Sequence, residues 1–352
     1  MNHESTDRMR FLCFGLGAIG TYIGGSLLDA GDEVVFIEHS SSLEQVRRQG
    51  LHLKLADRII TYPNIAVVGS LNAAIEIGEF DVAILAVKSF DTPSVISEIL
   101  PHTKHFPPVL CLQNGVENEE LIADAIGAWN VIGGSVTSAI GRVDIANAVV
   151  EKSRGVGIES THPLSERLIA HFNLAGLNTV GYADRRSLKW SKMLTNLQAN
   201  AVPAILHWSP YQVLSNPLSY SIECAALKEA TALMRKLGIR VVNLPGTPVR
   251  PWITAMTRLP QVLSRPLIGR LLGAGRGGKL PSLQIDLNAG RRQSEVIFLN
   301  GAVARIAKAN DFPAPVNTVL TQILIALAQG DIPQEQFANH PEELRRLIEE
   351  QL

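Results

Sequence analysis

The sequence is poor in several features that would each point to a particular class of protein. It has only three cysteines in 352 residues, and no two of them form a CxxC pair. An odd number of widely spaced cysteines indicates neither a disulfide framework nor a zinc site, so no metal is expected. The formal net charge is −1, which argues against the strongly basic surface typical of nucleic-acid binding.

Long apolar runs are also missing. Although 46% of the residues are hydrophobic, no run reaches the roughly 18 apolar residues expected of a membrane span. The first residues, MNHESTDR, are polar and lack the apolar core of a signal peptide. We expect a globular cytoplasmic protein with no membrane or nucleic-acid partner. Its oligomeric state stays open, with a homodimer among the alternatives.

The N-terminal half alternates between strand-like and helix-like segments. A buried strand is expected at 9–14, a helix at 18–30 and a second strand at 33–38. Further strands are expected at 81–87, 109–112, 131–135 and, with an antiparallel pattern, over 148–159. This alternation predicts an α/β fold whose N-terminal domain, residues 9–183, is a Rossmann-type doubly wound sheet.

From residue 184 onward the hydrophobic pattern is helical. Helices are expected at 185–201, 219–237, 283–310 and 317–329, whereas 245–278 is rich in Pro, Gly and Arg and predicts broken helical pieces and loop. The sequence therefore predicts a mainly α-helical second domain over 184–335. Residues 336–352 are expected to form a polar tail.

A glycine fingerprint follows the first strand. Gly15, Gly17 and Gly20 have the GxGxxG spacing, with Ala18 and Ile19 between the last two, at the start of the expected helix. Such a loop lets a dinucleotide pyrophosphate approach the backbone at a helix N-terminus, where N–H groups and the helix dipole favour negative charge. Glu38 ends the second strand. A carboxylate there normally binds the ribose 2′-hydroxyl of NAD, although the neighbouring His and Ser residues leave NADP open.

Two polar residues stand at the carboxyl ends of other expected strands. Lys88 follows the strand at 81–87, and Asn114 follows the strand at 109–112. Ligands of open α/β sheets bind outside these strand ends. Each residue by itself is equally well explained as a solvated cap or a turn, but their shared edge makes both candidates for the cofactor side of a site.

The second domain carries a candidate catalytic pattern. Lys192, Asn196 and Asn200 recur every fourth residue, which would align them on one face of a helix. A solvated outer face would more often carry Glu and Lys than Asn. Glu295 begins an expected helix whose apolar stripe includes Leu299, which places the carboxylate on the inward side.

These segments together resemble the ketopantoate reductase family. The resemblance rests on GLGAIG, AVKSFD with Lys88, LQNGVEN with Asn114, KMLTNLQAN with Lys192 and SEVIFLNGAVARIA with Glu295, in the same order over residues 9–329. It implies an active site in the cleft between a Rossmann domain and a helical domain. It also implies reduction of the C2 ketone of 2-dehydropantoate by NADPH, a step of pantothenate biosynthesis.

The resemblance also implies a role for each site residue. Lys192 is the expected general acid, and Glu295 is the carboxylate that binds the substrate hydroxyl. Asn196 and Asn200 are expected to contact the substrate, and Ser282 to hold its carboxylate. Lys88 and Asn114 are expected to line the cofactor side.

The chain departs from the family pattern at three places. The segment 281–286 around Ser282 resembles the family pattern at its ends but differs between them. The stretch 245–279 is longer than in compact members, and Glu38-His39 stands where NADPH-using members often carry an Arg. Two alternatives therefore stay open. One is an NAD(H)- or NADP(H)-linked enzyme acting on a different 2-keto or 2-hydroxy acid. The other is a non-catalytic dinucleotide-sensing protein.

Overall fold

The computed structural model describes residues 8–276 and 280–351. The polar leader 1–7 and residues 277–279, at the end of the Pro-, Gly- and Arg-rich stretch, lie outside the described residues. The chain divides into two compact units. Unit 1 comprises the residues up to 189 together with 244–247, and unit 2 comprises 190–243 and the residues from 248 onward.

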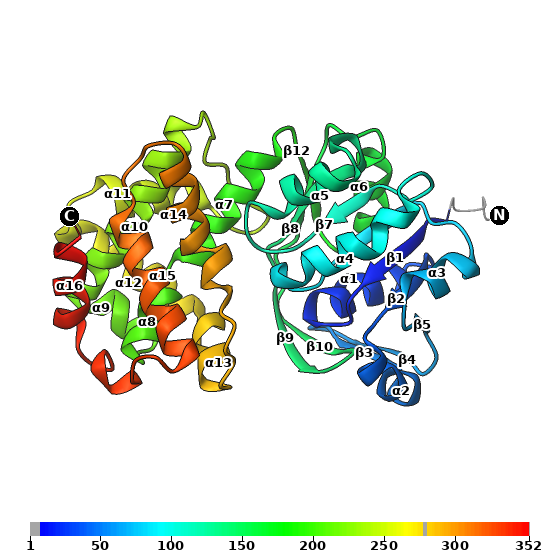
Figure 1. Ribbon diagram of the computed structural model, residues 1–352, viewed down its shortest axis with the longest axis horizontal. Helices are drawn as coiled ribbons and strands as arrows, with labels where there is room; N and C mark the ends of the chain where they lie inside the picture. The colour runs from blue at the N-terminus through cyan, green and yellow to red at the C-terminus, as the bar shows by residue number, and fades with distance from the viewer. Residues whose placement is uncertain (1–7, 277–279, 352) are drawn as a thin grey trace. The chain divides into compact units, whose positions relative to one another are not determined.

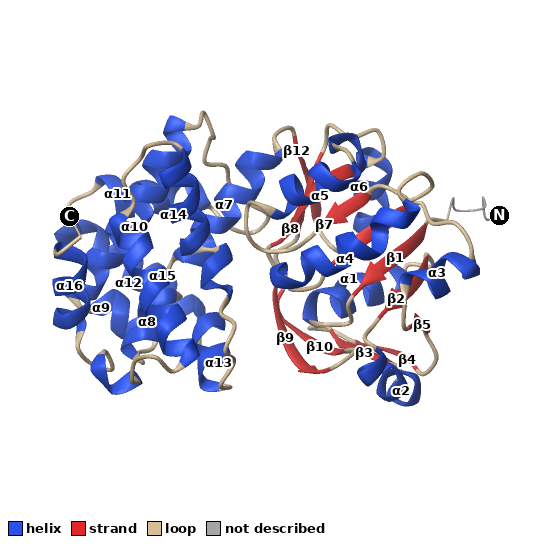
Figure 2. Ribbon diagram, in the orientation of Figure 1, coloured by secondary structure: helices blue, strands red, loops and turns tan. Residues whose placement is uncertain are grey.

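Unit 1 is built on an eight-stranded sheet (Figures 1 and 2). Its strands lie in the order β12 (Thr179–Tyr182), β11 (Val156–Glu159), β8 (Val131–Val136), β7 (Val109–Cys111), β6 (Val82–Leu85), β1 (Arg10–Phe14), β2 (Glu33–Ile37) and β5 (Ala66–Val68). Neighbouring strands are parallel except β11, which runs antiparallel to β8.

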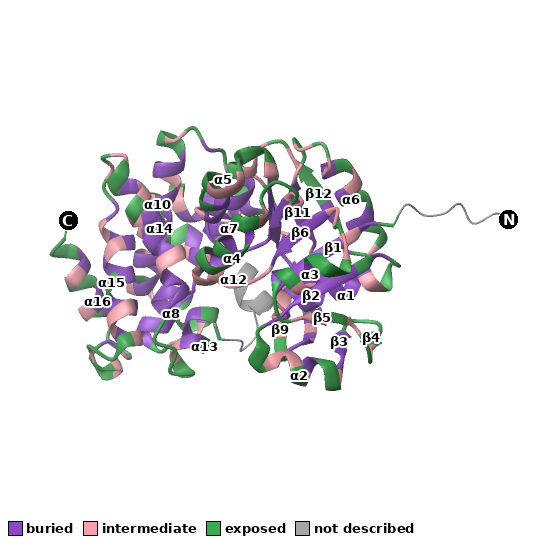
Figure 3. Ribbon diagram, turned by 45° about the vertical axis from the view of Figure 1, so that its right-hand side comes forward, coloured by how far each residue is buried: buried purple, intermediate pink, exposed green. Residues whose placement is uncertain are grey.

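Both faces of this sheet are buried. Alternate side chains of β1 point to opposite faces: Phe11 and Cys13 join one apolar cluster, and Leu12 and Phe14 join the other. The central strands are accordingly coloured as buried in Figure 3. Helices cover the sheet, namely α1 (Ala18–Asp29), α2 (Ser40–Gln49), α3 (Leu71–Ile77), α4 (Thr92–Ile99), α5 (Asn118–Ile126) and α6 (Ser165–Leu174). The expected Rossmann-type α/β fold is confirmed.

Unit 1 also contains a second sheet that the sequence analysis does not anticipate. Its order is β4 (Ile59–Tyr62), β3 (Leu51–Lys54), β10 (Asn147–Lys152) and β9 (Ala139–Asp144). The alternating segment 148–159 is thus split between two sheets, because β10 pairs with β9 and β3 whereas β11 pairs with β8. The second sheet packs against α1, so it completes the apolar cluster on that face.

Unit 2 is helical, in agreement with the expected fold class. Its helices are most of α7 (Arg185–Leu197), then α8 (Ala201–Leu206), α9 (Pro210–Ser215), α10 (Pro217–Lys236), α11 (Val249–Arg258), α12 (Gln261–Arg276), α13 (Ser282–Asn288), α14 (Asn300–Ala309), α15 (Pro315–Gln329) and α16 (Pro341–Glu349). The long helix α10 contacts α8, α9, α11, α12, α14, α15 and α16. No helix among the described residues is both long and apolar enough to cross a bilayer.

The helix expected at 185–201 is wrong at its end. Helix α7 stops at Leu197, and Ala199 adopts a left-handed conformation with φ of 47°. The N–H of Ala199 donates to Oε2 of Glu223 at 2.8 Å. Pro203 supplies the physical reason, because it has no N–H for the carbonyl of Ala199 and its ring would clash with that carbonyl in a continuous helix.

The helix expected at 283–310 is also divided. Helix α13 ends at Asn288, Gly290 has a φ of 67°, and a 3₁₀ turn, η4 (Glu295–Phe298), precedes α14. The side chain of Ser294 caps this turn by accepting from the N–H of Val296. Glu295 therefore begins a 3₁₀ turn instead of the α-helix that carries the rest of the expected stripe.

Within the expected polar tail 336–352, the described residues include a surface helix, α16. Helix α16 is amphipathic: Leu344 and Ile348 are buried, and the arginines on its outer face pair with Glu343, Glu349 and Glu350. It packs against α10 and α15. The segment is highly charged, but its apolar residues Leu344 and Ile348 are four residues apart and so lie on one face of a helix, which packs against the rest of the unit.

Candidate functional site

The glycine loop has the geometry that a dinucleotide site requires. Gly15 has a φ of 91°, which L side chains rarely adopt. A Cβ on Gly20 would lie 1.9 Å from the carbonyl oxygen of Gly15, whereas a Cβ on Gly17 would meet nothing within 4 Å. Gly17 is the N-cap of α1, so no side chain at this position accepts from the first N–H groups of the helix. The N-terminus of α1 is thus open beside Gly17, as binding of a pyrophosphate at a helix N-terminus would require.

Glu38 is attached to this loop. Its Oε2 accepts from the N–H of Leu16 at 2.8 Å, and its Oε1 accepts from the N–H of His39 at 3.0 Å. The residue is buried. The structure therefore brings the end of β2 and the glycine loop together, and it fixes the carboxylate between them.

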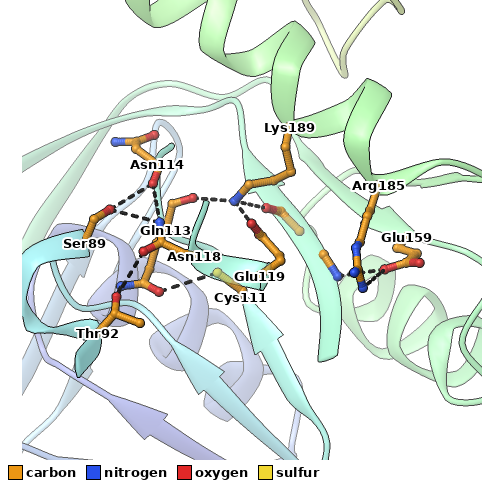
Figure 4. A network of polar contacts seen from close by, with 12 residues as sticks. Ser89, Thr92, Cys111, Gln113, Asn114, Asn118, Glu119, Glu159, Arg185 and Lys189 are labelled. Atoms are coloured by element: carbon orange, nitrogen blue, oxygen red, sulfur yellow. Dashed lines mark hydrogen bonds and ion pairs between the residues drawn. The ribbon is translucent and has the colours of Figure 1, made fainter. Parts of the chain in front are cut away.

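Lys88 and Asn114 are joined by a polar network within unit 1 (Figure 4). The side-chain amide of Gln113 donates to the carbonyl oxygens of Val87 and Lys88 and to Oγ1 of Thr92. The carbonyl oxygen of Asn114 accepts from Oγ of Ser89 and from Nδ2 of Asn118. The network therefore holds the backbone of both loops, and Figure 4 shows the amide of Asn114 pointing away from it.

Lys189 adjoins this network (Figure 4) and is not among the residues that the sequence analysis names. Its Nζ forms an ion pair with Glu119 at 2.7 Å and donates to the carbonyl oxygens of Gln113 at 2.6 Å and Gly134 at 3.2 Å. Burial by itself would lower the pKa of Lys189, but the carboxylate of Glu119 raises it above its usual value. The only sequence signal is a lysine between the apolar residues Leu188 and Trp190.

All three cysteines are buried free thiols. Burial raises the pKa of Cys13 to about 12 and that of Cys224 to about 11. Since the thiolate is the reactive form, neither residue is suited to nucleophilic chemistry.

In unit 2 three of the expected substrate-binding residues lie together. Nδ2 of Asn200 donates to the carbonyl oxygen of Asn196 at 3.0 Å and lies 3.4 Å from Oγ of Ser282. Oδ1 of Asn200 accepts from the N–H of Leu283 at 3.1 Å. Asn200 therefore links the break after α7 to the first turn of α13.

This arrangement corrects the expected helix face. Lys192 and Asn196 are one turn apart on α7, but Asn200 lies beyond the end of that helix. The reversal at Ala199 keeps Asn200 beside Asn196. Lys192 is half-buried, and Glu295 is 7% exposed in its 3₁₀ turn, which packs on α14 and α15.

Two protein-family models match the chain. The model described as ketopantoate reductase PanE/ApbA matches residues 11–159, and the model described as ketopantoate reductase PanE/ApbA C terminal matches residues 184–328. The first therefore falls within unit 1, and the second falls mainly on unit 2.

Individual relatives and solved structures agree with these matches. A 2-dehydropantoate 2-reductase of Pyrococcus horikoshii is 28% identical over 327 residues, which cover 90% of this chain and 97% of that protein. The structure of a PanE/ApbA family ketopantoate reductase from Ralstonia eutropha JMP134 has a TM-score of 0.77 at 23% identity, over 93% of this chain and 100% of the other. A D-mandelate dehydrogenase solved with NADH and anilino(oxo)acetate has a TM-score of 0.76 at 19% identity, over 92% and 99%. At these identities the two structures support the fold alone.

The glycines allow a matched pair of substitutions. We expect Gly20→Ala to destabilise unit 1 by about 1–3 kcal/mol, because the new Cβ overlaps the carbonyl of Gly15. Gly17→Ala should leave stability nearly unchanged and weaken dinucleotide binding about tenfold or more, because the methyl group enters space that a pyrophosphate would use. Denaturant titration and binding of reduced nicotinamide dinucleotide by fluorescence measure the two effects. Unchanged binding by Gly17→Ala would place the dinucleotide elsewhere.

The buried ion pair gives a second prediction. Lys189→Met should destabilise unit 1 by about 3–5 kcal/mol, because it leaves the charge of Glu119 buried without a cation. Adding Glu119→Gln should recover part of the loss. Arg345→Met removes an exposed ion pair to Glu349 and should cost at most about 1 kcal/mol.

The contribution of Lys189 also has a defined pH dependence. Because its folded pKa lies above the unfolded value, the contribution is fully present below about pH 10 and is lost only as the pH rises through the folded pKa. A wild-type minus Lys189→Met stability difference that declines between pH 6 and 9 would contradict this assignment.

Proposed function

The chain belongs to the ketopantoate reductase PanE/ApbA family, and from this premise we propose that it reduces the C2 carbonyl of a 2-keto acid, with 2-dehydropantoate as the first candidate. The product is then the 2-hydroxy acid pantoate. Unit 1 supplies the dinucleotide site, and unit 2 supplies the residues that act on the substrate.

One observation carries the substrate side of the proposal. The side chain of Asn200, just after α7, contacts the backbone carbonyl of Asn196 on α7 and Oγ of Ser282 at the start of α13, so these three residues are neighbours in unit 2. All three can donate hydrogen bonds without bringing a negative charge. They are thus suited to hold the carboxylate of a 2-keto acid, and Lys192 lies one helical turn before Asn196.

The proposed chemistry follows from where charge develops. When bound, reduced nicotinamide supplies the hydride that is added to C2. Negative charge then builds on the carbonyl oxygen, and the ammonium of Lys192 stabilises this oxygen and donates a proton to it. Glu295 accepts a hydrogen bond from a hydroxyl group of the substrate.

The residues of unit 1 fit a dinucleotide. Gly17, Ala18 and Ile19 at the start of α1 would hold its pyrophosphate, and the loops of Lys88 and Asn114 would line the cofactor side. The family resemblance favours NADPH. The buried carboxylate of Glu38 beside the loop favours NADH, because it would accept from a ribose 2′-hydroxyl and repel a 2′-phosphate.

A different 2-keto acid is the second candidate. The likeness to a D-mandelate dehydrogenase makes phenylglyoxylate, the keto acid of mandelate, a suitable comparison substrate. A non-catalytic dinucleotide sensor is less well supported, because a sensor needs the glycine loop but has no need of both Lys192 and Glu295.

The reaction is tested by the loss of reduced-nicotinamide absorbance with 2-dehydropantoate or phenylglyoxylate. Lys192→Ala should lower kcat by about 10²- to 10⁴-fold, as expected for the loss of a general acid, with little change in dinucleotide affinity. Lys228→Met is a matched control, since Lys228 is exposed on α10 of the same unit. An unaltered kcat in Lys192→Ala would remove Lys192 from the mechanism, and no turnover of either acid would favour the sensor.

Cofactor preference is tested at Glu38. Glu38→Gln retains acceptor capacity for the N–H of Leu16 and removes the charge, so we expect the ratio of kcat/KM for NADPH to that for NADH to rise about tenfold or more. Measuring both cofactors on both proteins gives this ratio directly. An unchanged ratio would mean that the carboxylate does not face the ribose.

A further inference from the structure

A cavity of about 640 Å³ lies within unit 2, apart from the residues assigned above. It is formed by the end of α10, the segment 239–242 and one face of α11, and these two helices pack against each other (Figure 1). Its volume is in the range of small-molecule sites. The lining residues are Thr231, Arg235, Ile239, Arg240, Val241, Val242, Arg250, Ile253, Thr254, Thr257 and Arg258.

The described charged residues that line this cavity are all positive. Four of its residues are arginines, and no acidic residue occurs among the described residues that line it. The whole chain is nearly neutral, with a formal charge of −1, so the positive charge is a local feature. Several arginines around one pocket create a locally positive potential, which favours an anion there.

Ordinary helix electrostatics explains only part of this cluster. Arg235 and Arg258 lie in the last turns of α10 and α11, where a cation is favoured by the helix dipole. Arg250 lies in the first turn of α11, where the dipole disfavours a cation. The helix dipole therefore does not account for the position of Arg250.

The geometry of α11 directs these groups to one side. Arg250, Thr254 and Arg258 are spaced four residues apart, so they follow one face of the helix. Beneath them Ile239 and Ile253 are buried and give the cavity an apolar floor. Such a site combines a charged rim with a surface against which an organic ring can pack.

We propose that this arginine pocket binds a phosphorylated small organic molecule of about nucleotide size. The planar guanidinium fork binds phosphate oxygens in pairs, and several such groups match the charge of a di- or triphosphate. The apolar floor accommodates the organic part. The site is independent of the reductase activity proposed above.

Calorimetric titration tests the site, with the dinucleotide site of unit 1 first saturated with reduced nicotinamide dinucleotide and with EDTA present. The probes are ATP, inorganic pyrophosphate, adenosine and citrate. We expect ATP and pyrophosphate to bind, ATP more tightly, and adenosine and citrate to bind at least tenfold more weakly. Affinity should fall as salt rises, because the rim is exposed to solvent.

Substitutions locate the binding. Arg250→Gln combined with Arg258→Gln should weaken ATP binding about tenfold or more, as expected for the loss of charged hydrogen bonds. Lys236→Gln is the matched control, because Lys236 follows Arg235 on α10 but faces the ring of Phe312 and does not line the pocket. Arg250 and Arg258 are exposed, so thermal unfolding of the double variant should stay close to that of the wild type. If the double variant is nevertheless unstable, Arg235→Gln alone serves as the second test.

Three outcomes would overturn the proposal. ATP binding that is undetectable, or equally strong in the double variant, would exclude the pocket as its site. Citrate binding as tight as that of pyrophosphate would mean that the pocket has no preference for phosphate. None of these results would bear on turnover of a 2-keto acid, so the two proposals fail separately.

Discussion

Unit 1 depends on one constraint, that the buried backbone groups at the carboxyl ends of its parallel strands must be hydrogen-bonded. Where a strand leaves the sheet, its N–H and C=O groups lose their ladder partners, and buried groups must find others. Polar side chains supply them. Glu38 accepts from Leu16 and His39, and Gln113 donates to the carbonyls of Val87 and Lys88. Side chains therefore hold the backbone at these strand ends, which is where the dinucleotide site is proposed.

The same requirement explains why a lysine is buried in unit 1. Lys189 donates to the carbonyl of Gln113, just after β7, and to that of Gly134, within the neighbouring strand β8. Its charge would be costly there without Glu119. Lys189, paired with Glu119, thus holds the backbone of the loop at Gln113, while the side chain of Asn114 is exposed.

In unit 2, backbone groups lose their partners where one helix ends and the next begins. After α7 the N–H of Ala199 donates to the carboxylate of Glu223. The side chain of Asn200 connects the carbonyl of Asn196 to the first turn of α13. Glu229 similarly accepts from the N–H groups of Val316 and Asn317 at the start of α15. Buried carboxylates and amides in this unit stabilise irregular backbone, and one such irregularity gathers the candidate substrate residues.

The two anion sites proposed here differ in chemistry. The candidate substrate residues are amides, a hydroxyl and a single lysine one turn before Asn196, which suits one carboxylate beside one developing charge. The arginine pocket offers several guanidinium groups and an apolar floor. The near-neutral total charge conceals this contrast, because charge is distributed unevenly over the surface.

The sequence by itself determined the α/β class, the glycine fingerprint, most strands of the large sheet and the helical character of unit 2. These features depend on local periodicity and on residues close together in the chain, such as Gly15 and Gly20. The tertiary structure decided what depends on distant partners. The small sheet requires β3 to pair with β10, and the roles of Lys189 and Gln113 require strands that only folding brings together. The break after α7 follows from the nearby Pro203, but the acceptor for the N–H of Ala199 is the distant Glu223. Four arginines spread over two helices and a loop became one pocket for the same reason: hydrogen bonds, burial and charge are settled by neighbours in space, which the order of residues along the chain does not specify.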